Sequence, residues 1–265
     1  DVTKAPNTIP YMIHLDKFFA KFNQSSYLIP ILFGLSIYLL VVGPLALIPS
    51  NIGWLGGGFD STQHYLGWAF FRFSPWSFPV GLNPNFGLEI SSSVVYSDSI
   101  PLLAIFFKIF HSSLSEPFQY FGIWLLLCFV LQAIFAWLIA KQFTCDFWLQ
   151  LLSMGIIVCS PIMWHRLGFQ SALSSHFLIL ASLYLFIKPQ QTIKIWQWPL
   201  LLLVAGMVHA YFLAMIFCIW LTRRLATFLR RTNNLAFNTS LEMGLIASML
   251  IIGLWQAGYF SIGET

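Results

Sequence analysis

The stretch "YLIPILFGLSIYLLVVGPLALI", residues 27–48, decides the fold class. It contains no charged residue, and its apolar residues do not alternate with polar ones. A helix needs about 20 apolar residues to cross a bilayer, whereas the strands of a transmembrane barrel alternate apolar and polar side chains. The stretch therefore predicts a membrane-spanning helix, and we expect the first span over 27–49.

The composition extends this prediction to the whole chain. Of its 265 residues, 58% are hydrophobic and 8% are charged, whereas soluble domains carry about a quarter charged residues. We therefore expect an all-α, polytopic membrane protein with a single transmembrane domain over 1–265. The four cysteines show no metal or disulfide spacing, and no nucleic-acid partner is predicted. The further hydrophobic segments are 118–140, 147–163, 172–187, 196–222 and 240–260.

The positions of the basic residues predict how the chain threads the membrane. Lys4, Lys17 and Lys21 precede the first span. Since cytoplasmic loops are enriched in Lys and Arg, we expect the N-terminal segment 1–26 in the cytoplasm. The long connection 50–117 then lies outside, and the remaining spans follow within 118–260.

One segment, 196–222 in "WQWPLLLLVAGMVHAYFLAMIFCIWLTRR", conflicts with a simple count of crossings. A single crossing would place the basic cluster that follows it outside, against the positive-inside rule. Gly206, His209 and Tyr211 interrupt the segment near its middle. Two half-helices that meet near "VHAY" would return the chain to the cytoplasm, and broken helices often mark binding sites. The alternative is one long tilted helix.

On this topology, the ionisable residues gather on the outer side. Ionisable groups near membrane depth are costly and are functional candidates by default. We therefore predict a site at the outer membrane face. The external loop and the later outer turns contribute Asp60, His64, Arg72, Glu89, Asp98, Lys108, His111, Glu116, His165, Arg166, His176 and His209.

Structural roles are alternatives for several of these residues. Asp60 could be the N-cap of an interfacial amphipathic helix over 61–73, with Gln63 closing a capping box. Asp98 could likewise cap a helix near Pro101 that ends at Lys108. The pair His165–Arg166 could be a charged turn that anchors two spans to lipid headgroups.

Four motifs carry a resemblance to a known family: "GGGFDSTQHYLGWAFFRFSPWSFPVGLNPNFG", "YSDSIPLLA", "EPFQYFGIWLLLCFVLQ" and "VHAYFLAM". Over about 40 to 260, the chain resembles a family of uncharacterised bacterial inner-membrane proteins that is usually assigned to the GT-C superfamily. Members of that superfamily are multi-span glycosyltransferases that use polyprenyl-phosphate sugar donors. The resemblance implies a GT-C-like helical bundle with interfacial helices in its long first loop and a broken-helix hairpin. It also implies more spans and an external C-terminal domain, which this sequence lacks.

The resemblance also assigns roles to residues. Asp60 matches the acidic residue of the first external loop, which activates the acceptor as a base or helps to bind a metal, and Asp98 is a second catalytic carboxylate. His209 matches the hairpin tip, near the lipid phosphate. The tight Asp-x-Asp pair is missing, so a divalent cation (Mg²⁺ or Mn²⁺) held by Asp60 and Asp98 stays an open possibility. The substrate-binding residues implied are His64, His165, Arg166, His176, His209 and Tyr211.

The expected function is therefore glycosyl transfer in the bacterial inner membrane. Hexose or pentose would move from a polyprenyl-phosphate donor to an extracytoplasmic acceptor, with the site on the periplasmic face. The partners are the lipid bilayer, the donor lipid and other membrane proteins. Two alternatives stay open: a non-catalytic membrane subunit or assembly factor that retains the GT-C fold, and a lipid or sugar-lipid transporter or flippase.

Overall fold

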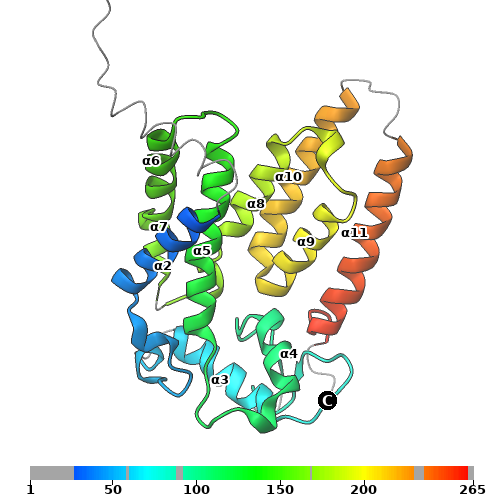
Figure 1. Cartoon of the computed structure of the whole chain (residues 1–265). Coiled ribbons are helices and arrows are strands. Elements are labelled where there is room, and N and C mark those ends of the chain that lie inside the picture. Colours follow the sequence, from blue (N-terminus) through cyan, green and yellow to red (C-terminus); the bar gives the residue numbers. More distant parts are fainter. Residues whose placement is uncertain (1–26, 58–59, 88–91, 168, 230–235, 262–265) are drawn as a thin grey trace, which may run out of the picture.

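The computed structural model describes residues 27–57, 60–87, 92–167, 169–229 and 236–261, with side chains from 239 in the last range. These residues are mostly helical (Figure 1). The strands within them, β1 (Leu82–Asn83) and β2 (Ser92–Ser93), form a short antiparallel pair. The N-terminal segment 1–26, predicted to be cytoplasmic, lies outside the described residues, as do Glu89 and the loop 230–235.

Four helical stretches in the described part of the chain are long and apolar enough to cross a membrane. Three helices of the same character are shorter, namely Leu28–Val41, Ala172–Ile187 and Gln197–Val208. The four candidate transmembrane helices indicate an integral membrane protein. They cover Phe121–Ala140, Phe147–Arg166, Ala210–Leu229 and Thr239–Ala257.

The first helix is shorter than the predicted span 27–49. Helix α2 covers Leu28–Val41, and the 3-10 helix η1 (Pro44–Leu47) follows it. The helix ends because Gly43 adopts a positive φ of 87° and Pro44 follows immediately.

The helices form two groups that meet at α8 (Phe177–Ile187). Helix α5 (Phe121–Ala140) packs against α2, α6 (Phe147–Val158) and α8. On the other side of α8 lie α9 (Gln197–Val208), α10 (Ala210–Leu229) and α11 (Ala236–Ala257) (Figure 1). A close backbone approach joins α2 to α5, since a Cβ atom on Gly34 would lie 2.7 Å from the Val130 Cα atom. Only glycine fits there.

The hydrophobic segment 196–222 is two helices rather than one long helix. Helix α9 ends at Val208, His209 is extended (φ −165°, ψ 138°), and α10 begins at Ala210. The chain reverses direction at this break, so α9 and α10 lie side by side with His209 at their tip (Figure 1).

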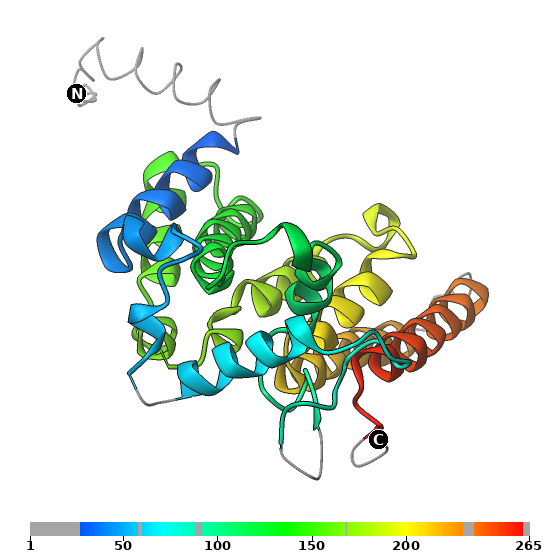
Figure 2. The ribbon, with the colours of Figure 1, turned by 90° about the horizontal axis from the view of Figure 1, so that it is seen from below.

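The long connection 50–117 gathers below one end of the helices and contains α3 (Asp60–Phe73) and α4 (Pro101–Ile109) (Figures 1 and 2). The face of α3 predicted to share His64, Trp68 and Phe71 is buried. Arg72 anchors the end of α3, because its guanidinium donates hydrogen bonds of 2.7–2.9 Å to the carbonyl oxygens of His111, Leu114 and Ser115.

The connection is also tied to the end of α11. The Gly81 N–H donates to the Gln256 carbonyl at 2.7 Å, and the Tyr96 hydroxyl donates to the Tyr259 carbonyl at 2.6 Å. In turn, the Tyr259 hydroxyl donates to the Gly206 carbonyl of α9 at 2.7 Å. These bonds hold the connection 50–117, α9 and α11 together.

The opposite end of the helices holds a buried ion pair. The Arg224 guanidinium of α10 contacts the Glu242 carboxylate of α11, and both side chains are almost completely buried. The second oxygen of Glu242 accepts a 2.8 Å hydrogen bond from the Trp220 indole N–H. The pair therefore links α10 to α11.

Candidate functional site

Asp98 lies between two histidines that come from different parts of the fold. Its Oδ1 atom is 3.4 Å from Nε2 of His209 at the helix break, and its Oδ2 atom is 4.0 Å from Nε2 of His64 on α3. The Asp98 side chain is 46% exposed, whereas the two imidazoles are 12% and 3% exposed. The carboxylate thus joins the connection 50–117 to the tip of α9 and α10 and still reaches solvent.

The prediction that Asp98 caps α4 is wrong. The N-cap position of that helix is Ile100, and no side chain forms a cap hydrogen bond there. Asp98 instead has a left-handed φ of 51°, which Asp tolerates better than most residues because its short polar side chain can bond locally. With this backbone conformation, the Asp98 carboxylate faces the two histidines and not the first turn of α4.

Asp60 belongs to a second polar contact. It is the first residue of α3, and its Oδ2 atom accepts a 2.9 Å hydrogen bond from Nε2 of Gln170. The other end of the same amide, Oε1, accepts a hydrogen bond from Nη1 of Arg166. A neutral amide therefore separates the carboxylate from the guanidinium.

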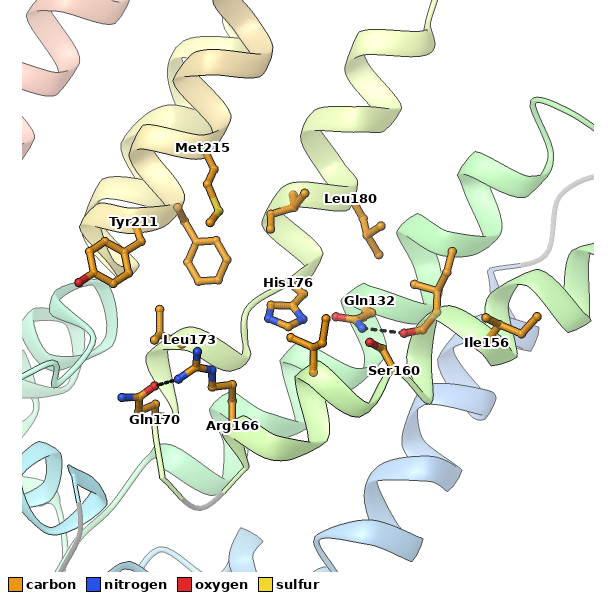
Figure 3. A pocket seen from close by; sticks show the side chains of 14 residues that line it. Gln132, Ile156, Ser160, Arg166, Gln170, Leu173, His176, Leu180, Tyr211 and Met215 are labelled. Atoms are coloured by element: carbon orange, nitrogen blue, oxygen red, sulfur yellow. Dashed lines mark hydrogen bonds between the residues drawn. The ribbon is translucent and has the colours of Figure 1, made fainter.

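Arg166 and Gln170 line a cavity of about 670 Å³ between α5, α6, α8, α10 and the short helix α7 (Pro161–Arg166) (Figure 3). The wall is mainly apolar, with Leu180 and Met215 among its residues. Its rim is open, since Ile162 is 68% exposed. Polar side chains in the lining are Gln132, Ser160, Arg166, Gln170, His176 and Tyr211.

The cavity is connected to the Asp98 contact through neighbouring residues of α10. The Tyr211 N–H donates to Nδ1 of His209 at 3.1 Å, and the two rings lie 4.7 Å apart. Asp60 and His64 lie four residues apart on α3, which places them on one face of that helix. The two carboxylates and the cavity therefore belong to one region of the protein.

The structure brings most of the predicted site residues into this region, and His165 is the exception. His209 contacts Asp98, not the cavity, and it is absent from the cavity lining. His165 stands apart: it is exposed, and its ring stacks on Phe169 with centroids 6.4 Å apart.

Three polar residues of the region were missed from the sequence. Gln170 follows Arg166 by four residues, a spacing that brings side chains together on a helix, and this could have indicated the pair. Gln132 and Ser160 gave no signal, because a single polar residue in an apolar segment is common. Gln132 donates to the Ile157 carbonyl at 3.1 Å.

A resident metal does not fit the described residues. Among them, no group of three or more His, Cys, Asp or Glu side chains is placed to hold a metal ion. Asp60 and Asp98 bond instead to an amide and to imidazoles, so the divalent cation left open by the sequence has no ligand set here.

The His64 imidazole gives the region a pH dependence. Burial lowers the pKa of His64 below its ordinary value of 6.5, against the opposing effect of Asp98 and Asp60, while His209 lowers it further. The folded protein therefore binds fewer protons than the unfolded chain in the range just below pH 6.5. The contribution of neutral His64 to stability is fully present above that pH and is lost as the pH falls.

We expect the melting temperature of the parent protein to fall more between pH 7 and pH 5 than that of His64→Gln. Glutamine cannot be protonated, so the variant lacks this part of the loss. Thermal unfolding of both proteins in detergent, at steps of half a pH unit, measures the difference. If the melting temperatures of the two proteins fell by the same amount over this pH range, His64 would not be the source of the pH dependence.

The comparisons with known proteins identify the family. Residues 31–265 match the model of a family described as a domain of unknown function, DUF6311. Comparison with curated proteins and with solved structures finds no match. Since the match covers most of the sequence, the chain belongs to the DUF6311 family.

Proposed function

We propose that the chain is a GT-C-like membrane glycosyltransferase that moves a sugar from a polyprenyl-phosphate donor to an extracytoplasmic acceptor. One observation carries the proposal: Asp60 and Asp98 share a region with an apolar cavity that contains the Arg166 guanidinium. Transfer from a lipid phosphate requires a base for the acceptor, a cation for the departing phosphate and a wall that accepts hydrocarbon.

The cavity supports a lipid-linked donor. Its apolar side chains, including Ile179, Leu180 and Met215, suit the first isoprene units of the lipid. The exposed rim at Ile162 and Tyr211 would face the bilayer, so a lipid chain could enter from the side. Arg166 would then meet the phosphate, because a guanidinium matches phosphate oxygens with two parallel N–H groups.

In the proposed reaction, the acceptor hydroxyl oxygen forms a bond to the anomeric carbon of the sugar. The bond from that carbon to the phosphate oxygen breaks, and the bonding electrons leave on the polyprenyl phosphate. The Asp60 carboxylate takes the hydroxyl proton. Asp98 supplies a negative charge near the oxocarbenium-like transition state that glycosyl transfer shares with glycoside hydrolysis.

The proposal includes a location and an orientation. The protein lies in the bacterial inner membrane with its N-terminus in the cytoplasm and its site at the periplasmic face. In support, the site lies at the end of the helices where 50–117 gathers, while Lys141 and Lys188 follow α5 and α8 at the other end (Figure 1). Basic residues favour the cytoplasmic side.

A transfer assay tests the function. Membrane vesicles from bacteria that express the chain receive undecaprenyl phosphate linked to radiolabelled hexose or pentose. Transfer is measured as the radiolabel that is no longer extracted into organic solvent with the lipid donor. We expect transfer that depends on the chain. Arg166→Gln should raise the donor concentration for half-maximal rate by roughly tenfold or more, since a charge-assisted phosphate contact is lost.

Lys194→Gln is the matched control, because Lys194 is exposed and is not one of the residues that line the cavity; its rate should equal that of the parent. If the parent moves neither hexose nor pentose, the enzyme proposal falls. The alternative of a non-catalytic membrane subunit or assembly factor would then be favoured. Movement of intact donor across the vesicle membrane would instead favour a flippase.

A further inference from the structure

We infer that Gln170 is a positioning residue, whose neutral amide keeps the Asp60 carboxylate and the Arg166 guanidinium from pairing with each other. Its effect on transfer rests on the proposed function. Its effect on anion binding rests on the structure alone. The inference concerns a residue for which the sequence predicts no role.

The Gln170 amide donates a hydrogen bond through its nitrogen and accepts one through its oxygen. Nε2 donates to Asp60 at 2.9 Å, and Oε1 accepts from Arg166. A flipped amide would place its oxygen against the carboxylate and its N–H groups against the guanidinium, so one orientation is fixed. The backbone of Gln170 is also held, since its N–H donates to the Arg166 carbonyl at 3.0 Å.

A direct pair would change the chemistry of both groups. Arginine and carboxylate form strong bidentate pairs, and a single amide is all that separates Asp60 from Arg166 here. Such a pair would use the guanidinium N–H groups that otherwise face the cavity, and it would occupy the carboxylate. The amide keeps Arg166 available to an anion and Asp60 available to a hydroxyl.

Two substitutions separate this role from simple packing. Gln170→Leu removes the bridge and lets Asp60 and Arg166 approach each other. Gln170→Glu introduces a carboxylate that pairs with Arg166 and repels Asp60. When that carboxyl group is protonated it again has an O–H donor for Asp60 and a C=O acceptor for Arg166, so it imitates glutamine.

The test is binding of farnesyl phosphate, a short polyprenyl phosphate, to the purified full chain in detergent, measured by calorimetry. At pH 7.5 we expect both variants to bind about tenfold or more weakly than the parent. Between pH 7.5 and pH 4, a range that crosses the ordinary glutamic acid pKa of about 4.3, we expect Gln170→Glu to recover part of the loss relative to the parent. Gln170→Leu should not recover. A role in packing alone predicts no such pH-dependent rescue.

Gln191→Leu, the same change at an exposed glutamine that does not line the cavity, is the matched control and should bind as the parent does. Equal binding of parent and Gln170→Glu at pH 7.5 would overturn the inference. Absence of farnesyl phosphate binding by the parent would overturn it as well. Binding that follows the expected pattern without any sugar transfer would leave the positioning role intact and reject the proposed function.

Discussion

Replacing Asp60 by Asn is expected to lower sugar transfer by about a hundredfold to ten-thousandfold, the range that a general base contributes. The substitution keeps the size and hydrogen-bonding shape of the side chain, so its oxygen can still accept from the Gln170 amide. It removes the charge that takes the acceptor proton. Initial rates with saturating labelled donor measure the loss, and the donor concentration for half-maximal rate should change little.

Asp146→Asn provides a matched control for this prediction. Asp146 is also an exposed residue at a helix start, where its Oδ1 atom accepts a 2.8 Å hydrogen bond from the Leu149 N–H. Asparagine is an equally good N-cap, and Asp146 lies outside the site, so the rate should match the parent. A rate for Asp60→Asn within a factor of about three of the parent would remove Asp60 from the role of base.

Replacing Glu242 by Gln is expected to destabilise the fold by about 3–5 kcal/mol, because it leaves the buried Arg224 cation without a counter-charge. Both side chains are less than a tenth exposed. Glutamine retains an acceptor for the Trp220 indole, so the Glu242–Trp220 bond is not the main loss. A marked drop in the midpoint of thermal unfolding in detergent is the measured result.

The double variant Arg224→Leu and Glu242→Leu tests whether the unpaired Arg224 charge causes the loss of stability. Replacing both members of a buried pair by apolar residues is often neutral or stabilising, so the double variant should unfold at a higher temperature than Glu242→Gln alone. If the double variant is the less stable of the two, the loss comes from packing rather than from an uncompensated charge.

Much of the fold follows from local sequence pattern. The apolar runs locate the helices, and the periodicity of His64, Trp68 and Phe71 locates the buried face of α3. The interruption by Gly206, His209 and Tyr211 locates the break between α9 and α10. These features depend on neighbours in sequence, where the rules of side-chain spacing apply.

The polar contacts of the site could not be predicted in the same way. Gln170 and Asp60 are 110 residues apart, and their contact depends on how the connection 50–117 lies across the helices. Asp before Pro101 has the pattern of a helix cap, so the sequence leaves capping open as an alternative role for Asp98. The structure rules that alternative out, since Asp98 has a left-handed conformation and its carboxylate lies beside His209. A local pattern does not reveal a tertiary partner.

The bonds between the connection 50–117 and the end of α11 also set an order of events during synthesis. The Val80 N–H donates to the Gln256 side chain, 176 residues later in the chain. Gly81 packs directly against Ala257, where any side chain would clash, since a Cβ atom on residue 81 would lie 2.1 Å from the Ala257 carbonyl oxygen. These contacts cannot form until α11 has been synthesised and inserted into the bilayer. We therefore expect the connection to stay accessible to protease until α11 is inserted and to acquire full protection only then.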